Sequence, residues 1–342
     1  MDWTQLDWQA LDRLRGNFLR SGDGAAAGEP YWRSRADLAN YDLTYAERIG
    51  WKWDAVLSEL RRRGWAPPAQ ARVLLDWGCG SGVASRRVLG AFDVENFDTL
   101  LLWDYSPLAR DYAAEVARRD FPKLEIAEFT GASPVSASFV LVVSHVINEL
   151  PPPALGELLA LARRAEAVIW VEPGTHADSR ALVAVREQFR ESFRIVAPCT
   201  HGAACGLLAA GNERHWCHNF AEPPPNIHAN SNWVKFGKRA GIDLRSLPYS
   251  FLVLEKKCEG GARHEARELS GVSRIIGRPR FHKAHASICN CDVNGVSELA
   301  LYKRGAPAFF KKLEREPAHP PLYAWERDVA APERIVAGRV AG

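Results

Sequence analysis

Long hydrophobic runs are absent from this 342-residue sequence. No apolar run approaches the roughly 18 to 20 uncharged residues that a membrane-spanning helix needs. The first twelve residues contain three aspartates and no basic residue, which argues against a secretory signal or an Arg-rich transit peptide. These absences predict a cytoplasmic protein with no membrane partner. At roughly 150 residues per domain, the length allows one large domain with insertions or two smaller ones.

A disulfide framework is not expected either. The seven cysteines are an odd number with unequal spacing, and no signal peptide precedes them. Six of the seven lie between Cys199 and Cys291, and only Cys79 lies outside that stretch. In a reducing compartment, clustered cysteines more often indicate a metal site than a disulfide bridge.

The hydrophobic pattern predicts an α/β fold behind a helical N-terminal region. Apolar residues recur at helical spacing through residues 1–68, which end at two prolines. Between residues 69 and 190, short apolar strands alternate with helices, as in a parallel sheet covered on both faces. Strands are expected at 72–77, 99–105, 139–144 and 167–172, and helices from 85, at 108–119 and at 153–164.

Periodicity weakens after residue 190. Residues 191–231 are expected to form a Cys- and His-rich loop that binds a metal cluster. Residues 232–305 are expected to complete the sheet and to add a small basic, β-rich part, and residues 306–342 to form a C-terminal tail. This half should contain a helix at 232–240 and strands at 250–256, 286–291 and 298–302.

Positive charge is concentrated in this second half. Residues 231–320 carry 17 Lys and Arg against 9 Asp and Glu, although the net charge of the whole chain is only +3. The densest stretch, residues 274–285, suits contact with a phosphate backbone, and the alternative is a solvated basic loop. The candidate RNA-binding residues in it are Arg274, Arg278, Arg280 and Lys283.

A glycine-rich loop follows the first expected strand. The residues DWGCGSG at 76–82 precede a helix, where glycines let a ligand approach the backbone and the helix N-terminus offers free N–H groups. An acidic residue precedes the first glycine, unlike the G-x-G-x-x-G of dinucleotide-binding proteins. Asp104, at the end of the second strand, is placed to accept hydrogen bonds from ribose hydroxyls. A glycine turn that binds no ligand is the alternative.

This arrangement resembles the class I S-adenosylmethionine-dependent methyltransferases. The resemblance implies a Rossmann-like, doubly wound sheet in which Asp76 organises the loop, the loop admits the methionine part of the cofactor, and Asp104 holds its ribose. The other residues that the resemblance assigns to cofactor binding are Gly78, Cys79, Gly80, Ser81 and Gly82.

The fourth expected strand leads into SHVINEL at 144–150, where that family has its active-site mouth. The segment lacks the N/D-P-P-Y/F signature of amino-group methyltransferases, and no cysteine stands where a pyrimidine C5 methyltransferase has its nucleophile. Asn148 and Glu149 either orient a substrate by hydrogen bonds or cap the next helix. The catalytic residues are therefore not identified.

Three cysteines and three histidines lie within residues 199–218. Cys199, Cys205 and Cys217 do not have the C-x-x-C spacing of a zinc ribbon, so zinc is not specifically indicated. Thiolates gathered in a loop hold zinc or an iron–sulfur cluster, and a cluster requires four cysteines. Three unrelated cysteines in a surface loop are the alternative.

Further motifs resemble the mitochondrial and bacterial small-ribosomal-subunit methyltransferase-like proteins of the Rsm type. They are EPGT at 172–175, APC-x-H at 197–201, WCH at 216–218, R-P-R at 278–280 and C-x-x-x-G at 291–295. The resemblance covers about residues 70–305. It implies S-adenosylmethionine, a 4Fe–4S cluster and association with the rRNA and proteins of the small ribosomal subunit during its assembly. The cluster ligands it implies are Cys199, Cys205, Cys217 and Cys291, with Cys289 as a substitute for the last and Cys258 as a bystander.

Two functions fit these expectations, for a protein that is monomeric when free. One is transfer of a methyl group from S-adenosylmethionine to small-subunit rRNA. The other is a non-catalytic assembly factor that binds RNA, which the missing acceptor motif favours. A small-molecule methyltransferase with a zinc loop is a more distant alternative. The N-terminal aromatic residues, among them Trp32, Tyr41 and Tyr45, are expected to belong to a helical cap over the cofactor site rather than to stack on RNA.

Overall fold

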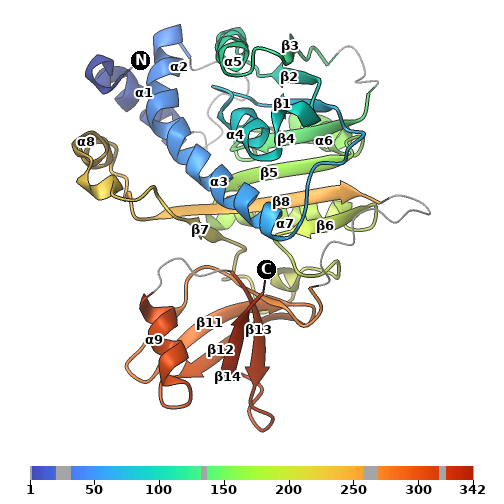
Figure 1. Ribbon diagram of the computed structural model, residues 1–342, viewed down its shortest axis with the longest axis vertical. Coiled ribbons are helices and arrows are strands. Elements are labelled where there is room, and N and C mark those ends of the chain that lie inside the picture. The colour runs from blue at the N-terminus through green and yellow to red at the C-terminus, as the bar shows by residue number, and fades with distance from the viewer. Residues whose placement is uncertain (1, 21–31, 132–136, 258–268, 316–320, 342) are drawn as a thin grey trace. The chain divides into compact units, whose positions relative to one another are not determined.

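The computed structural model describes residues 2–20, 32–131, 137–257, 269–315 and 321–341 of the chain (Figure 1). Cys258 lies outside the described residues. The chain divides into two compact units. The first unit comprises Met1–Glu59, Ala66–Glu172 and Glu222–Leu247, and the second comprises Leu60–Trp65, Pro173–Ala221 and Pro248–Gly342.

Helices form the N-terminal part of the first unit, as the spacing of its apolar residues predicts. The hydroxyl of Ser34 begins one of them by accepting a hydrogen bond from the backbone N–H of Asp37. Leu14, Trp32 and Leu38 pack in one buried cluster with residues of α5 (Pro107–Asp120). The segments are η1 (Trp3–Gln5), α1 (Trp8–Arg20), α2 (Arg35–Tyr41), the π-helical η3 (Asp42–Ala46) and α3 (Glu47–Arg62).

Five of the described strands run parallel in the first unit, in the order β3-β2-β1-β4-β5. The chain leaves β1 toward β2 on one side and returns to β4 on the other. The carboxyl ends of β1 and β4 therefore frame the crevice where ligands bind in such sheets. The strands are β1 (Val73–Trp77), β2 (Thr99–Trp103), β3 (Glu125–Glu128), β4 (Phe139–Ser144) and β5 (Ala167–Pro173), and the other helices are α4 (Val83–Phe92), η4 (Val94–Asn96), α6 (Pro152–Ala162), η6 (Ile227–Ala229) and α8 (Ser231–Ala240).

The first unit is thus a mixed α/β structure around a central sheet, as expected from the alternation of strands and helices. β3 is the strand that the hydrophobic pattern missed. It begins and ends on exposed glutamates, Glu125 and Glu128, because it forms the edge of the sheet and buries little.

The second unit opens with a helix that the apolar pattern also missed. The hydroxyl of Thr175 caps α7 (His176–Phe189) by accepting a hydrogen bond from the N–H of Asp178, 3.2 Å long. The buried face of this helix includes the charged Arg186, which obscures the apolar period. The helix is followed by β6 (Phe193–Ala197), the short η5 (Gly206–Leu208) and β7 (Asn219–Ala221), and β6 and β7 both pair with β8 (Leu247–Lys256).

A small β-barrel forms the rest of the second unit. β9 (Ser273–Ile275) pairs with both β11 (His285–Asp292) and β13 (Leu322–Arg327), which closes the sheet on itself. Four strands, of which the short β10 (Arg280–Phe281) pairs only with β11 among the described strands, are followed by a helix and a final hairpin, and the fourth strand lies parallel to the last. This order and connectivity are those of an OB-fold. The remaining elements are β12 (Gly295–Tyr302), α9 (Pro307–Arg315) and β14 (Arg334–Val340).

The barrel corrects the expectation of a C-terminal tail. The segment after residue 306 supplies α9, β13 and β14, and its side chains fill the barrel interior. Phe310 and Leu313 of α9, Tyr323 of β13 and Ile335 of β14 pack with Ile288 in one buried cluster. Burial of these side chains removes apolar surface from water and holds the segment in place.

Candidate functional site

The glycine-rich loop of the first unit lies between β1 and α4. The N–H groups of Gly78 and Cys79 both donate to the carbonyl of Trp103 at the end of β2, over 2.8 and 2.9 Å. Gly80 has a φ of +52°, and a Cβ built on it would meet no atom within 4 Å. The backbone of Gly80 therefore faces open space, as a ligand that approaches the chain closely requires.

Two aspartates organise this loop. Oδ2 of the buried Asp76 accepts hydrogen bonds from the hydroxyl and the N–H of Ser85, over 2.6 and 3.2 Å, which ties β1 to the start of α4. Asp104 follows β2 and accepts hydrogen bonds from the N–H groups of Gly80 and Ser106, both 2.9 Å long. Burial raises the pKa of Asp76 to about 6 and also raises that of Asp104.

The segment after β4 forms one side of the same crevice. A Cβ on Gly78 would lie 2.6 Å from Cγ1 of Val146, so glycine is needed where this segment meets the loop. Oε1 of the buried Glu172 fixes the segment by accepting hydrogen bonds from the N–H groups of Val146 and Ile147, over 3.2 and 3.1 Å. Asn148 is exposed and Glu149 is half-buried. Burial and the nearby Asp104 raise the pKa of Glu149 to about 7.

His145 opens this segment with a φ of +56°. Nζ of Lys52 donates to its Nε2 over 3.1 Å. Burial and the positive charge of Lys52 hold the pKa of His145 well below its usual value, so its ring is neutral at physiological pH. The indole of Trp53, one residue later on α3, donates to the hydroxyl of Ser144 over 3.0 Å.

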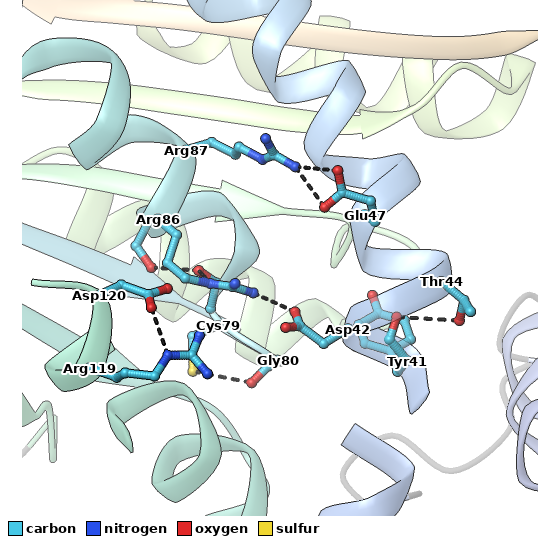
Figure 2. A network of polar contacts seen from close by, with 12 residues as sticks. Tyr41, Asp42, Thr44, Glu47, Cys79, Gly80, Arg86, Arg87, Arg119 and Asp120 are labelled. Atoms are coloured by element: carbon cyan, nitrogen blue, oxygen red, sulfur yellow. Dashed lines mark hydrogen bonds and ion pairs between the residues drawn. The ribbon is translucent and has the colours of Figure 1, made fainter. Parts of the chain in front are cut away.

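The N-terminal helices are tied to α4 directly after the glycine loop. Figure 2 shows Arg86 paired with Asp42 of the π-helical turn and Arg87 bidentate to Glu47 of α3, over 2.7 Å to each oxygen. Tyr41 lies at this junction. Burial raises the pKa of its phenol, and the charges of Glu149, Asp42 and Asp104 raise it further, which places Tyr41 beside the carboxylates of the crevice. This position fits the helical cap that the sequence predicts.

The residues present fit a polar ligand at the glycine loop. Oδ1 of Asp76 and the hydroxyl of Ser81 are buried and have no hydrogen-bond partner among the described residues. Buried polar atoms are normally paired, so each one without a partner calls for an explanation. Together with the open space beside Gly80, these atoms suit a ligand rich in hydroxyl and amino groups, such as S-adenosylmethionine.

The expected cysteine ligands come together in the second unit. Cys199, Cys205, Cys217 and Cys291 all line one pocket, and they arrive there from the loop after β6 and from β11. The side chain of Arg186 enters the same pocket, and its Nε lies 3.2 Å from the sulfur of Cys199. The pocket gathers residues that are far apart in the sequence.

Arginine side chains hold the chain around this pocket. Arg63 donates to the carbonyls of Val196, Pro198 and Cys199, over 2.8, 2.9 and 3.0 Å. Nε of the buried Arg274 donates to the carbonyl of Pro198 over 2.6 Å. The backbone before the first expected ligand is thus fixed from two sides.

Serine hydroxyls fix the third expected ligand. The side chains of Ser179 and Ser250 both donate to the carbonyl of Cys217, over 2.6 and 2.5 Å. Burial raises the pKa of Cys217 to about 12, with a further contribution from the thiol of Cys199. Burial raises the pKa of Cys291 as well, and Cys199, Cys217 and Cys205 add to it, because the four thiols are neighbours.

Cys289 has different surroundings from Cys291. It does not line the pocket, and its sulfur lies 3.9 Å from Nδ1 of His215. Burial raises the pKa of Cys289 to about 11, and the charge of Glu298 raises it further, whereas the other thiols do not contribute. Alternation along β11 turns both cysteines to the same side of the strand, but they lie two residues apart, and only Cys291 lines the pocket.

Among the residues that the structure describes, no group of three or more His, Cys, Asp or Glu side chains could hold a metal ion. A zinc ion and a 4Fe–4S cluster both need such a group of ligands, so this finding supports neither of them. The cluster and its zinc alternative both stay predictions.

Comparison with known families decides where the chain belongs. Residues 45–316 match the family described as mitochondrial small ribosomal subunit Rsm22. The chain belongs to the Rsm22 family. The resemblance to the small-subunit proteins that the sequence motifs indicate is therefore confirmed. The description names mitochondria, whereas the cytoplasmic location expected from the N-terminal residues stays a prediction. The described part of this Rsm22-family chain contains no helix with the length and apolar character that membrane crossing requires.

Comparison with solved structures finds methyltransferases. Magnesium protoporphyrin IX methyltransferase from Synechocystis, with bound S-adenosylhomocysteine, is 11% identical, covers 73% of this chain and 100% of its own, and has a TM-score of 0.38. Precorrin-6y C5,15-methyltransferase from Geobacter metallireducens is 12% identical, with 60% and 87% coverage and a TM-score of 0.36. The 23S rRNA methyltransferase ErmE is 13% identical, with 58% and 67% coverage and a TM-score of 0.31. The comparison with curated proteins finds no match.

Of the four residues expected to bind RNA, one is buried and three are exposed. Arg274 is buried and bonded to Pro198 and to Asn219, so the expectation that it contacts RNA is wrong for this structure. The guanidinium of Arg274 lines the cysteine pocket and donates to the backbone there. A run of basic residues in the sequence does not show that one of them is buried. The exposed residues are Arg278, which lies 4.0 Å over the ring of Phe220, Arg280, which pairs with Glu298, and Lys283.

Sequence reasoning missed several residues of both sites. Tyr41 and Lys52 reach the crevice only through tertiary packing of the N-terminal helices, and no local signal marks them. Arg186 carried a usable signal, because it stands among Leu182, Val185 and Phe189 on the apolar face of a helix. A charge at such a position indicates a buried partner.

Proposed function

We propose that this Rsm22-family protein binds S-adenosylmethionine at the glycine loop and acts on the small ribosomal subunit. The observation that carries the proposal is the loop itself, with an open Gly80, a buried Asp76 and the carboxylate of Asp104 at the switch point of a parallel sheet. Asp104 would accept hydrogen bonds from the ribose, and residues 78–82 would line the methionine part. Bound there, S-adenosylmethionine supplies an electrophilic methyl group.

For catalysis, Glu149 is the best-placed group of the crevice. A pKa of about 7 lets it exist in both protonation states near neutral pH, as a proton acceptor for an RNA nucleophile requires. Asn148 beside it is exposed and has an amide that can hydrogen-bond a base. The neutral His145 and the buried Glu172 would hold this segment in position, and the acceptor would be small-subunit rRNA.

A second function, assembly of the subunit without methyl transfer, is favoured by one observation. One oxygen of Asp104 already accepts a hydrogen bond from Gly80 of the loop and the other from Ser106, and Oε1 of Glu172 already accepts two from the segment after β4. These carboxylates maintain the shape of the crevice. A protein that needs the cofactor to stabilise one shape, rather than to react, would keep the same groups.

Methyl transfer distinguishes the two functions. Purified protein is incubated with methyl-labelled S-adenosylmethionine and immature small subunits, beside Asp76→Ala and the matched control Asp98→Ala, whose carboxylate lies on the surface and pairs with Arg72. Label in the rRNA that Asp76→Ala loses and Asp98→Ala keeps supports the enzyme. Cofactor binding without label supports the assembly factor. Absence of cofactor binding in the wild type refutes both forms of the proposal.

We also propose that Cys199, Cys205, Cys217 and Cys291 hold a 4Fe–4S cluster. What supports it is the single pocket that the four thiols share and the mutual effect of their charges. The cluster would join the loop after β6 to the barrel strand β11 and so contribute to folding. Broad visible absorption of anaerobically purified protein, with matching iron and sulfide contents, would support this proposal, and a colourless protein that contains only zinc would refute it.

A further inference from the structure

The outer face of the OB-fold barrel is divided into a covered half and an open half. On β11 and β12, Ala286, Ile288 and Leu299 point into the barrel, so the residues between them point outward. At one end of this outer face the cysteine loop packs against the barrel. A Cβ on Gly206 would lie 2.6 Å from the Cα of Gly295, and Val296 packs beside Cys205.

The open half presents aromatic rings. His285 of β11 stands opposite Tyr302 of β12, and their ring centroids are 5.7 Å apart. The ring of His282 stacks on that of His285 with centroids 4.6 Å apart. Tyr302 is 42% exposed, which is unusual for a large aromatic side chain inside a strand. The rings form a platform on which flat groups can stack.

Cations surround this platform. The guanidinium of Arg334, from the neighbouring β14, lies 5.2 Å from the ring of Tyr302. Lys283 in the turn before β11 and Arg304 after β12 are exposed, whereas Nζ of Lys303 lies 5.4 Å from the ring centroid of the core residue Phe310. Among the acidic residues there, Glu298 pairs with Arg280 and Asp328 lies 3.8 Å from Arg334, whereas Glu333 is exposed. The net exposed charge left over is positive.

We propose that this open half of the barrel binds single-stranded RNA. Bases would stack on Tyr302 and on the histidine pair, and phosphates would lie along Lys283 and Arg304. OB-folds bind single-stranded nucleic acids without sequence preference through aromatic rings and cations on their second and third strands, which correspond to β11 and β12 here. A duplex keeps its bases stacked inside the helix and cannot use the rings, so the face should prefer single strands. The inference requires neither methyl transfer nor the metal cluster.

Fluorescence anisotropy of the full chain with a labelled single-stranded RNA of about 12 nucleotides tests the proposal, since OB-folds cover roughly 4–16 nucleotides. Tyr302→Ala should weaken binding by about 5- to 150-fold, the effect of losing one base stack. Tyr302→Phe keeps the ring and should bind like the wild type. Because Tyr302 lies on the surface, both variants should melt close to the wild type, and the phenylalanine variant separates loss of stacking from loss of folding.

The charges are tested with a second pair of variants. The double variant Lys283→Glu and Arg304→Glu should lower the slope of log affinity against log salt by about 1.4, the value for two lost phosphate contacts on a single strand. The matched double variant Lys311→Glu and Lys312→Glu changes two exposed lysines of α9 and should leave the slope closer to the wild-type value. Equal binding of duplex and single strand, or wild-type affinity in Tyr302→Ala, would overturn the proposal and leave a protein partner for this face.

Discussion

Replacing Gly80 by alanine tests the cofactor site with a single methyl group. At a φ of +52°, an L side chain costs roughly 1–2 kcal/mol of folding free energy. No steric clash adds to that cost, because the new Cβ would meet no protein atom within 4 Å. The methyl group would instead occupy the space that a ligand close to the loop must enter. We therefore expect a modest loss of stability and a large loss of cofactor binding.

Gly64 provides the matched control. It follows α3 with a φ of +71°, and a Cβ there would also meet no atom within 4 Å. Gly64→Ala should therefore carry the same backbone cost, and both variants should melt about 2 to 8 °C below the wild type. Only Gly80→Ala has its methyl group at the glycine loop, so the two variants should differ in cofactor binding alone.

Isothermal titration calorimetry with S-adenosylmethionine measures that difference. We expect the Kd of Gly80→Ala to rise by about tenfold or more, which corresponds to roughly 1.4 kcal/mol of lost binding free energy. The Kd of Gly64→Ala should equal that of the wild type. The reasoning is refuted if Gly80→Ala binds the cofactor as tightly as Gly64→Ala does, because the open space beside the loop would then not be the binding site.

Two further predictions concern a carboxyl group and a thiol. The raised pKa of Glu149 contributes stability that is present below about pH 4.5 and is lost as the pH rises through about 7, so Glu149→Gln should raise the melting temperature relative to wild type more at about pH 8 than at about pH 5. An equal difference at both values would contradict the assigned pKa. Cys217→Ser should purify poorly soluble and without iron, whereas Cys289→Ser, outside the pocket, should keep its iron. Iron lost equally from both variants would contradict the ligand assignment.

The parallel sheet and its loop were predictable because local chemistry dictates them. Strands buried on both faces must be continuous apolar runs, as in Phe139–Ser144, and a loop that a ligand approaches needs residues such as Gly80. Asp76 was predictable for a related reason. A carboxylate directly before such a loop can bind the start of the next helix, as Asp76 does with Ser85 of α4. Each of these features depends on residues that are close together in the sequence.

The barrel and its pocket were not predictable in the same way. Its core joins Ile288, Phe310 and Ile335, which come from three separate elements. The strands β9 and β10 are too short to show an alternation of apolar and polar residues. Arg274 illustrates the difficulty, because the sequence shows its charge but not its burial. Tyr41 reaches the crevice only through the ion pairs that dock its helix, a contact between distant segments.

The position of Cys291 within the barrel imposes an order on synthesis. Its strand pairs with β9 and β12, and β12 in turn pairs with β14, the last of the described strands. The three earlier cysteines leave the ribosome before any of these strands exists. The pocket can thus be completed only after these strands have been synthesised, and a chain that terminates before Cys291 would carry three of the four thiols. With the proposed cluster in this pocket, retention of iron would then report that the barrel strands have been made.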